Sequence, residues 1–186
     1  LWDRYTRNWV WINFVFSGEV LSLNKERMIK ELCKAIADVK EKKPLIEQVT
    51  NYVTINDCAN VTLAIGASPV MGDGYEEVDQ MTMIADALVL NYGIINGESL
   101  KTMIKAGRTA NEYNIGIVLD PVGVGATKFR NEAIVDLLDQ VHPSIIKGNA
   151  SEIMSLSGMD TKSKGVDSSA DSLEALDAAV KVARDY

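Results

Sequence analysis

The stretch "IGIVLDPVGVGATKFR", residues 115–130, joins the pattern of a buried strand to a glycine-rich turn. A run of apolar, mostly β-branched residues ends on one acid, Asp120, and Pro121 then prevents further ladder pairing. In open α/β sheets, ligands bind outside the carboxyl ends of the strands. Gly123 and Gly125 would let the backbone approach such a ligand closely. The stretch therefore predicts a strand that ends on an acid facing a ligand.

Strand and helix patterns alternate on both sides of this stretch. The apolar strands show no polar alternation, and amphipathic helices separate them. Strands are expected at 45–50, 68–71, 87–91, 115–119 and 144–148, and helices at 28–43, 53–65, 75–86, 98–114, 128–141, from 150 onward and at 172–185. The alternation predicts an α/β fold with a mostly parallel sheet covered by helices on both faces. The polar, turn-rich stretch 159–172 is expected to be a surface loop.

Composition excludes several classes of function. The 186 residues are 47% hydrophobic, enough for a real core, and the formal charge of −7 has the wrong sign for binding a phosphate backbone. The apolar run 9–16 is interrupted by Asn13 and is too short to span a bilayer. Cys33 and Cys58 show neither metal spacing nor a disulfide framework. We therefore expect a cytoplasmic protein that binds neither nucleic acid nor membranes.

The first 27 residues differ from the rest of the chain. They hold all three tryptophans, and no clear cleavage site of a signal peptide follows their apolar run. Met28 opens a stretch whose apolar residues share one helical face. The expectation is that residues 1–27 are an atypical extension or upstream sequence and that the native chain begins near Met28. Residues 28–186 would then form one α/β domain.

A second strand pattern, "IIKGNASEI" at 145–153, ends in the same way as the first. Lys147 stands at the strand end, Asn149 can cap the next helix, and Glu152 falls in its first turn. If the two strands are neighbours, Asp120, Lys147 and Glu152 meet at one edge of the sheet. Two carboxylates and one cation suit Mg²⁺ that carries phosphates, because magnesium prefers oxygen ligands.

Structural readings of the same residues remain open. An aspartate before proline is a common turn former, and Glu152 in a first helical turn complements the helix dipole. The glycine turn lacks the Walker A pattern, and Lys128 stands where a dinucleotide fingerprint would need its third glycine. A nicotinamide oxidoreductase is therefore disfavoured. The residues alone predict a parallel α/β protein with a magnesium–phosphate edge and leave its substrate open.

Four motifs together resemble hydroxyethylthiazole kinase, a family of the ribokinase-like superfamily. They are "PLIEQVTNYVTINDCANVTLAIGASPVM" at 44–71, "ALVLNYG" at 87–93, "DPVGVGAT" at 120–127 and "GNASEI" at 148–153. The similarity runs from Pro44 to about Ser157 and corresponds to the N-terminal two-thirds of the family's domain. It implies a ribokinase-like three-layer α/β/α fold. It also implies an enzyme that phosphorylates the alcohol of 4-methyl-5-(2-hydroxyethyl)thiazole with ATP and Mg²⁺. It also implies homotrimers with active sites between subunits.

The resemblance assigns roles to individual residues. Met71 would contact the thiazole, chiefly through its main chain, and Asn51 would line the same pocket. Asp120 and Glu152 would hold Mg²⁺, directly or through water, and Lys147 would meet the phosphates of ATP. These roles fit phosphoryl transfer, in which catalysis is mostly positioning and charge neutralisation.

The chain departs from the family pattern at three places. The family usually has arginine at Lys147 and histidine near Glu47, and it carries a Gly-Thr/Ala-Gly-Cys anion hole in a part that would follow Tyr186. The catalytic residues are therefore unknown, and residues 1–186 alone are expected not to turn over. The alternative is a non-catalytic thiazole-binding or assembly module of the same fold.

Overall fold

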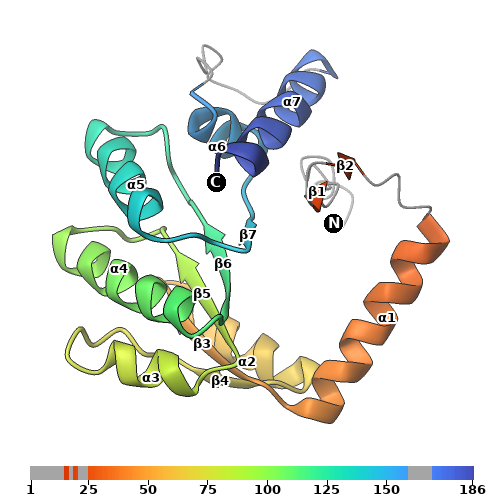
Figure 1. The fold of residues 1–186 in the computed structure, drawn as a ribbon, viewed down its shortest axis with the longest axis vertical. Helices are drawn as coiled ribbons and strands as arrows, with labels where there is room; N and C mark the ends of the chain where they lie inside the picture. Colours follow the sequence, from red (N-terminus) through yellow and green to blue (C-terminus); the bar gives the residue numbers. More distant parts are fainter. Residues whose placement is uncertain (1–14, 17–18, 21–24, 159–168) are drawn as a thin grey trace.

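The computed structural model describes residues 15–16, 19–20, 25–158 and 169–186 (Figure 1). Most of the N-terminal extension and most of the surface loop expected at 159–172 lie outside the described residues. The strands are β1 (Val15–Phe16), β2 (Glu19–Val20), β3 (Leu45–Val49), β4 (Ser68–Val70), β5 (Ala87–Asn91), β6 (Gly116–Asp120) and β7 (Ile145–Ile146). The helices are α1 (Lys25–Lys42), α2 (Ile55–Ile65), α3 (Val78–Ile84), α4 (Gly97–Glu112), α5 (Lys128–Gln140), α6 (Ala150–Leu156) and α7 (Ser169–Asp185).

The predicted parallel sheet is confirmed. Five strands follow the order β4-β3-β5-β6-β7, and every neighbouring pair is parallel. In β5 and β6 buried residues alternate with partly exposed ones, so one face of these central strands is fully covered and the other only in part. In the pairing of β5 with β6, Asn91 is the register partner of Asp120, so both strands end level with each other.

The main core lies between the sheet and the helices α3, α4 and α5, which Figure 1 shows together on one side of the strands. Leu88 and Leu90 of β5 are fully buried there, as are Ala106 and Ala110 of α4. Small residues on α4 let the helix approach the strands closely, so the polar ends of β5 and β6 are held by a dry, well-packed base.

The opposite side of the sheet is covered differently. There α2 lies beside β4, and the side chain of Gln48 on β3 donates a hydrogen bond of 2.9 Å to Thr62 on α2. No residue of α2 is buried, and Val61 and Leu63 are more than half exposed. The third layer of the fold therefore leaves apolar side chains in contact with solvent in this chain.

The helix expected at 75–86 is shorter than the sequence pattern suggested. It spans only Val78–Ile84, since residues 75–77 form a turn, Ala85 is already extended, and the backbone amide of Asp86 donates to the carbonyl of Leu45 at 2.8 Å. The Asp86 carboxylate also accepts from the Leu45 amide at 2.7 Å. These two bonds join the start of β3 to the segment entering β5, and this pairing competes with the helical period of the sequence.

Other helix starts also differ from the expected positions by one to three residues. The first helix begins at Lys25, before Met28, and the last begins at Ser169 rather than at residue 172. Among the described helices, none combines the length and apolarity needed to cross a membrane.

A close helix–loop approach makes Gly107 of α4 a test of this packing. A Cβ at this position would lie 2.5 and 2.6 Å from the methyl carbons of Val141. Alanine gains about 1 kcal/mol of helix propensity, whereas overpacking costs about 1–3 kcal/mol. We expect Gly107→Ala to lower the free energy of unfolding by about 1 kcal/mol in urea titrations. Adding Val141→Ala should make the Gly107→Ala step favourable. In Gly97→Ala, the matched control, the new methyl group meets no atom within 4 Å, and stability should not fall.

Candidate functional site

The carboxyl ends of β6 and β7 bring two predicted site residues together. Lys147 directly follows β7, and its Nζ lies 2.9 Å from Oδ2 of Asp120, the last residue of β6. The Asp120 side chain is 16% exposed and that of Lys147 is 47% exposed, so the pair borders solvent. The sequence expectation that these two residues gather at one edge is confirmed by this contact.

Two asparagines extend the Asp120–Lys147 pair along the edge of the sheet. Asn91, the last residue of β5, donates from Nδ2 to Asp120 Oδ2 at 3.1 Å. Asn51, which follows β3, donates from Nδ2 to Asn91 Oδ1 at 2.9 Å. A continuous polar row therefore runs from Asn51 through Asn91 and Asp120 to Lys147. We call these four residues the edge row.

Sequence reasoning had missed Asn91, although a signal was present. The segments "ALVLN" (87–91) and "GIVLD" (116–120) have equal length, and each ends an apolar run on one polar residue. In a parallel sheet, such segments can lie side by side with their ends level, which places their polar residues next to each other. Only the observed register shows that they do so here.

Glu152 is tied to the glycine turn that follows Asp120. Its Oε1 accepts from the Gly123 amide at 3.1 Å, and its Oε2 accepts from the Asn149 amide at 2.8 Å. The Asn149 side chain accepts from the Glu152 amide in return, which completes a capping box at the start of α6. Gly123 and Gly125 have φ of +73° and +89°, in the left-handed region that favours glycine. Glu152 therefore fixes the shape of the turn beside Asp120.

The oxygen atoms of the edge fit a magnesium ion that arrives with phosphates. Both hydrogen bonds to Asp120 go to Oδ2, and Oδ1 accepts none from the described residues. Each oxygen of Glu152 accepts one amide and keeps a further lone pair. No group of three or more His, Cys, Asp and Glu side chains suited to a metal occurs in the described part of the chain. Two carboxylates with oxygens still able to accept are a donor set compatible with Mg²⁺, which is usually held by one or two carboxylates plus substrate phosphates.

Arg130 fastens two loops behind the edge row, and nothing in its sequence context indicated this. Its guanidinium donates to the carbonyls of Tyr92 and Val122 from Nη1 and to that of Gly93 from Nη2, at 2.8–2.9 Å. The Tyr92 hydroxyl donates back to the Arg130 carbonyl at 2.9 Å, and burial raises the pKa of Tyr92 to about 12. The loops after β5 and β6 are thereby held as one unit.

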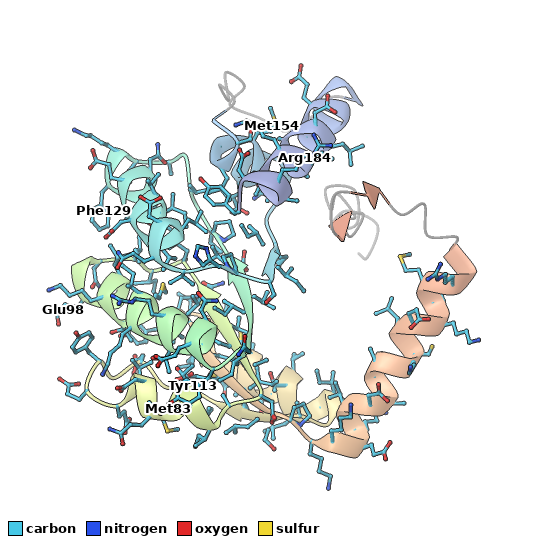
Figure 2. The ribbon with its side chains drawn as sticks, viewed as in Figure 1. Met83, Glu98, Tyr113, Phe129, Met154 and Arg184 are labelled. Carbon is cyan, nitrogen blue, oxygen red and sulfur yellow. The ribbon has the colours of Figure 1, made fainter. Side chains whose placement is uncertain are left out.

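A cavity of about 280 Å³ opens beside the first residue of the edge row. Thr50 and Tyr52, the neighbours of Asn51, line it together with Gly74 and the start of α4, where Figure 2 labels Glu98. Neither Asn51 nor Met71 lines this cavity. Met71, half-buried, directly follows β4 and stays two strands away from Asn91.

Lys105 of α4 holds the loop that leads from Met71 to α3. Its Nζ donates to the carbonyl of Tyr75 at 2.8 Å, lies 2.8 Å from Asp79 Oδ1, and sits 4.9 Å from the centre of the Tyr75 ring. The hydrogen bond from Lys105 lowers the pKa of Asp79. Lys105 therefore holds the part of the cavity lining that contains Tyr75 against α4.

Glu47 is a fully buried acid beneath this loop. Its side chain is 0% exposed, its Oε1 has no hydrogen-bond partner among the described residues, and a Cβ on Gly72 would lie 3.0 Å from Oε1. Burial raises the pKa of Glu47 to about 7, and the hydrogen bond with Thr82 opposes this rise. Glu47, near which the resemblance implies a histidine, therefore lies inside the protein, behind Gly72.

The geometry around Thr82 gives a separate reason for a proton on Glu47. The hydroxyl oxygen of Thr82 lies 2.7 Å from the carbonyl of Val78 and 2.6 Å from Glu47 Oε2. One hydroxyl proton cannot serve two acceptors at such distances. Thr82 donates to Glu47 when the acid is ionised. When Glu47 is protonated, its O–H can donate to Thr82 while Thr82 donates to Val78, which removes the conflict.

The sheet order, the helical layers and the polar carboxyl edge define an α/β protein of the ribokinase-like fold. The solved structure of a hydroxyethylthiazole kinase protein from Pyrococcus horikoshii OT3 matches with a TM-score of 0.67 and 43% identity, over 69% of this chain and 50% of that one. The hydroxyethylthiazole kinase family matches residues 36–186. The chain belongs to the hydroxyethylthiazole kinase family, as its motifs had suggested.

Relatives in other organisms support the same membership. A hydroxyethylthiazole kinase of Alkaliphilus oremlandii is 51% identical over 144 residues, which are 77% of this chain and 53% of the relative. One from Thermoanaerobacter sp. is 48% identical over 159 residues, 86% of this chain and 59% of the relative. The chain therefore spans between half and three-fifths of the length of these relatives.

The proton on Glu47 predicts how stability depends on pH. In the unfolded chain Glu47 loses its proton near its ordinary pKa of 4.5, whereas the folded protein keeps it until about pH 7. The free energy of unfolding should therefore fall between these pH values by about 3 kcal/mol, at 1.36 kcal/mol per pKa unit, and then level off. Urea titrations at stepped pH measure this decline.

Glu47→Gln is the matched variant for this prediction, because its amide can donate to Thr82 at every pH. We expect Glu47→Gln to abolish this decline and to exceed the unmodified protein in stability at pH 8. Glu112→Gln, at an exposed acid of α4, should leave the decline in place. An equal slope in Glu47→Gln and the unmodified protein would show that Glu47 is already ionised below pH 7.

Proposed function

We propose that this protein takes part in the ATP-dependent phosphorylation of 4-methyl-5-(2-hydroxyethyl)thiazole, in thiamine biosynthesis or salvage in the cytoplasm. The edge row is the observation that carries the proposal. Its one carboxylate with an open oxygen and its cation lie at the carboxyl edge of a parallel sheet, where α/β proteins bind ligands. Because the chain spans only part of its relatives' length, the proposal concerns the activity to which this part contributes.

Each end of the edge row has a separate task in this proposal. Lys147 attracts the phosphates of ATP, and Asp120 with Glu152 holds Mg²⁺, which neutralises phosphate charge when bound. Asn149 and the glycine turn keep Glu152 in place. The row itself orients these groups before substrates arrive, which favours phosphoryl transfer because positioning supplies much of its catalysis.

The thiazole alcohol belongs at the other end of the row. Asn51 and the main chain of Met71 are the proposed contacts. Neither lines the cavity of about 280 Å³, but Thr50 and Tyr52 on either side of Asn51 do, and its volume has room for a small heterocycle next to Asn51. Lys105 secures the loop that carries Met71. The hydroxyl to be phosphorylated would point along the edge toward Asp120.

The homotrimer of the family is also proposed for this protein. The apolar side chains that α2 leaves exposed support an assembly, because large exposed apolar surfaces commonly mark interaction sites. Sedimentation velocity would support the trimer with a mass of three chains and contradict it with a mass of one.

A kinase assay tests the proposed function. Protein that includes the Gly-x-Gly-Cys motif, supplied with ATP, Mg²⁺ and the thiazole alcohol, should release thiazole phosphate, whereas residues 1–186 alone should not. Asp120→Asn should lower kcat by at least ~10²-fold, the order expected for removing a major electrostatic contribution. Thiazole binding without turnover in the longer protein would favour the non-catalytic module. Absence of thiazole binding in calorimetry would contradict both functions.

Lys147 provides a second, independent prediction. Lys147→Ala should weaken ATP binding by roughly 1.5–3 kcal/mol, the scale of a charge-assisted hydrogen bond. Lys147→Arg should bind ATP at least as well as the unmodified protein, because the guanidinium can grip phosphate with two donors. Equal ATP affinity in all three proteins, measured by calorimetry, would contradict a role for Lys147 in binding ATP.

A further inference from the structure

Asn91 is the central member of the edge row, and its neighbours allow only one orientation of its amide. Its Oδ1 accepts from Asn51 Nδ2 at 2.9 Å and from the Gly93 amide at 3.0 Å, while its Nδ2 donates to Asp120 Oδ2 at 3.1 Å. In the flipped orientation, two donors would face its NH₂ group and a carboxylate would face its oxygen. The orientation therefore follows from the surrounding donors and acceptors.

Asn91 is also the connection between the two proposed ends of the site. The strand β5 lies between β3, which leads to Asn51, and β6, which ends at Asp120. Among the described residues, no hydrogen bond joins Asn51 directly to Asp120; both bond to Asn91. The side chain of Asn91 thus spans from one neighbouring strand to the other.

We propose that Asn91 is a positioning residue that links Asn51 to the Asp120 carboxylate, so that a change at Asn51 alters the orientation of that carboxylate. The functional role of this link rests on the proposed function, because that function places thiazole at Asn51 and phosphate at Asp120. Asn91 itself touches neither ligand in this assignment. It acts through the orientation of Asp120.

The physical basis is the loose terminal torsion of an aspartate. The carboxylate rotates over a broad range unless its oxygens are bonded, so an aspartate needs external contacts to hold one oxygen toward a ligand. Asn91 and Lys147 both bond Oδ2, at 3.1 and 2.9 Å, and together direct Oδ1 away from the row. Hydrogen bonds in a chain also polarise each other, so the bond from Asn51 strengthens the one that Asn91 makes to Asp120.

The test is a mutant cycle read by the ¹³C signal of the Asp120 carboxyl carbon, in residues 1–186 without ligand. Asn91→Ala should shift this signal, because the carboxylate loses a donor. Asn51→Ala should shift it in the unmodified background and should not shift it further in the Asn91→Ala background. Asp120→Asn assigns the signal, and this readout reports the carboxylate rather than the stability of the fold.

A matched control separates the link from a general loss of packing. Asn111 also uses its side-chain amide to join two segments, since it donates to the His142 carbonyl and accepts from the His142 amide, both at 2.8 Å. Asn111→Ala should leave the Asp120 signal in place. If Asn91→Ala does not give a folded amide spectrum, Asn91→Val serves instead, because valine suits a strand and forms no side-chain hydrogen bond.

The outcomes distinguish this inference from the proposed function. The link would be overturned if the Asp120 signal did not shift in Asn91→Ala or in Asn51→Ala. It would also be overturned if Asn51→Ala still shifted the signal in the Asn91→Ala background. Adding 4-methyl-5-(2-hydroxyethyl)thiazole should move the Asp120 signal in the unmodified protein and move it less in Asn91→Ala, which lacks the path through Asn51. If the thiazole changes no signal at all, the proposed function fails, and the ligand-free cycle still decides the role of Asn91.

Discussion

The parallel pairing of β5 with β6 sets the positions on which the candidate site depends. Because Asn91 and Asp120 are register partners, the last polar residue of each strand meets the other at the edge of the sheet. A slip of one residue would turn Asp120 toward the opposite face, since side chains alternate along a strand. The fully buried Leu88, Leu90 and Ile117 resist such a slip, because it would expose apolar surface. Packing deep in the core thus controls hydrogen bonding at the surface.

Two acids of this protein show how local surroundings set the state of a carboxyl group. Asp120 borders solvent, and its Oδ2 lies 2.9 Å from the ammonium group of Lys147. Glu47 is enclosed, and burial raises its pKa to about 7. In the proposed function Asp120 meets Mg²⁺ and phosphate, whereas Glu47 lies behind a loop. The same functional group therefore has a part in the proposed site in one place and in internal packing in the other.

The regular elements were largely predictable from local patterns. Continuous apolar runs predict buried strands, and capping residues such as Asn149 indicate where helices begin. The helix at Val78–Ile84 was overestimated because the pairing of Asp86 with Leu45 joins residues far apart in the chain. Hydrophobic periodicity carries no information about such a partner, so this boundary could not be found locally.

The candidate site was likewise predictable only in part from the sequence. The motifs around Asp120, Lys147 and Glu152 were sufficient to predict a polar edge and the family, because the residue types at the strand ends can be read directly from the sequence. The roles of Asn91 and Arg130 depend on which strands are neighbours and how loops fold back, and these are long-range properties. The proton on Glu47 likewise depends on burial by segments remote in sequence. Residue identity supplies the chemical groups, and tertiary packing supplies the distances and dielectric surroundings that give each group its state.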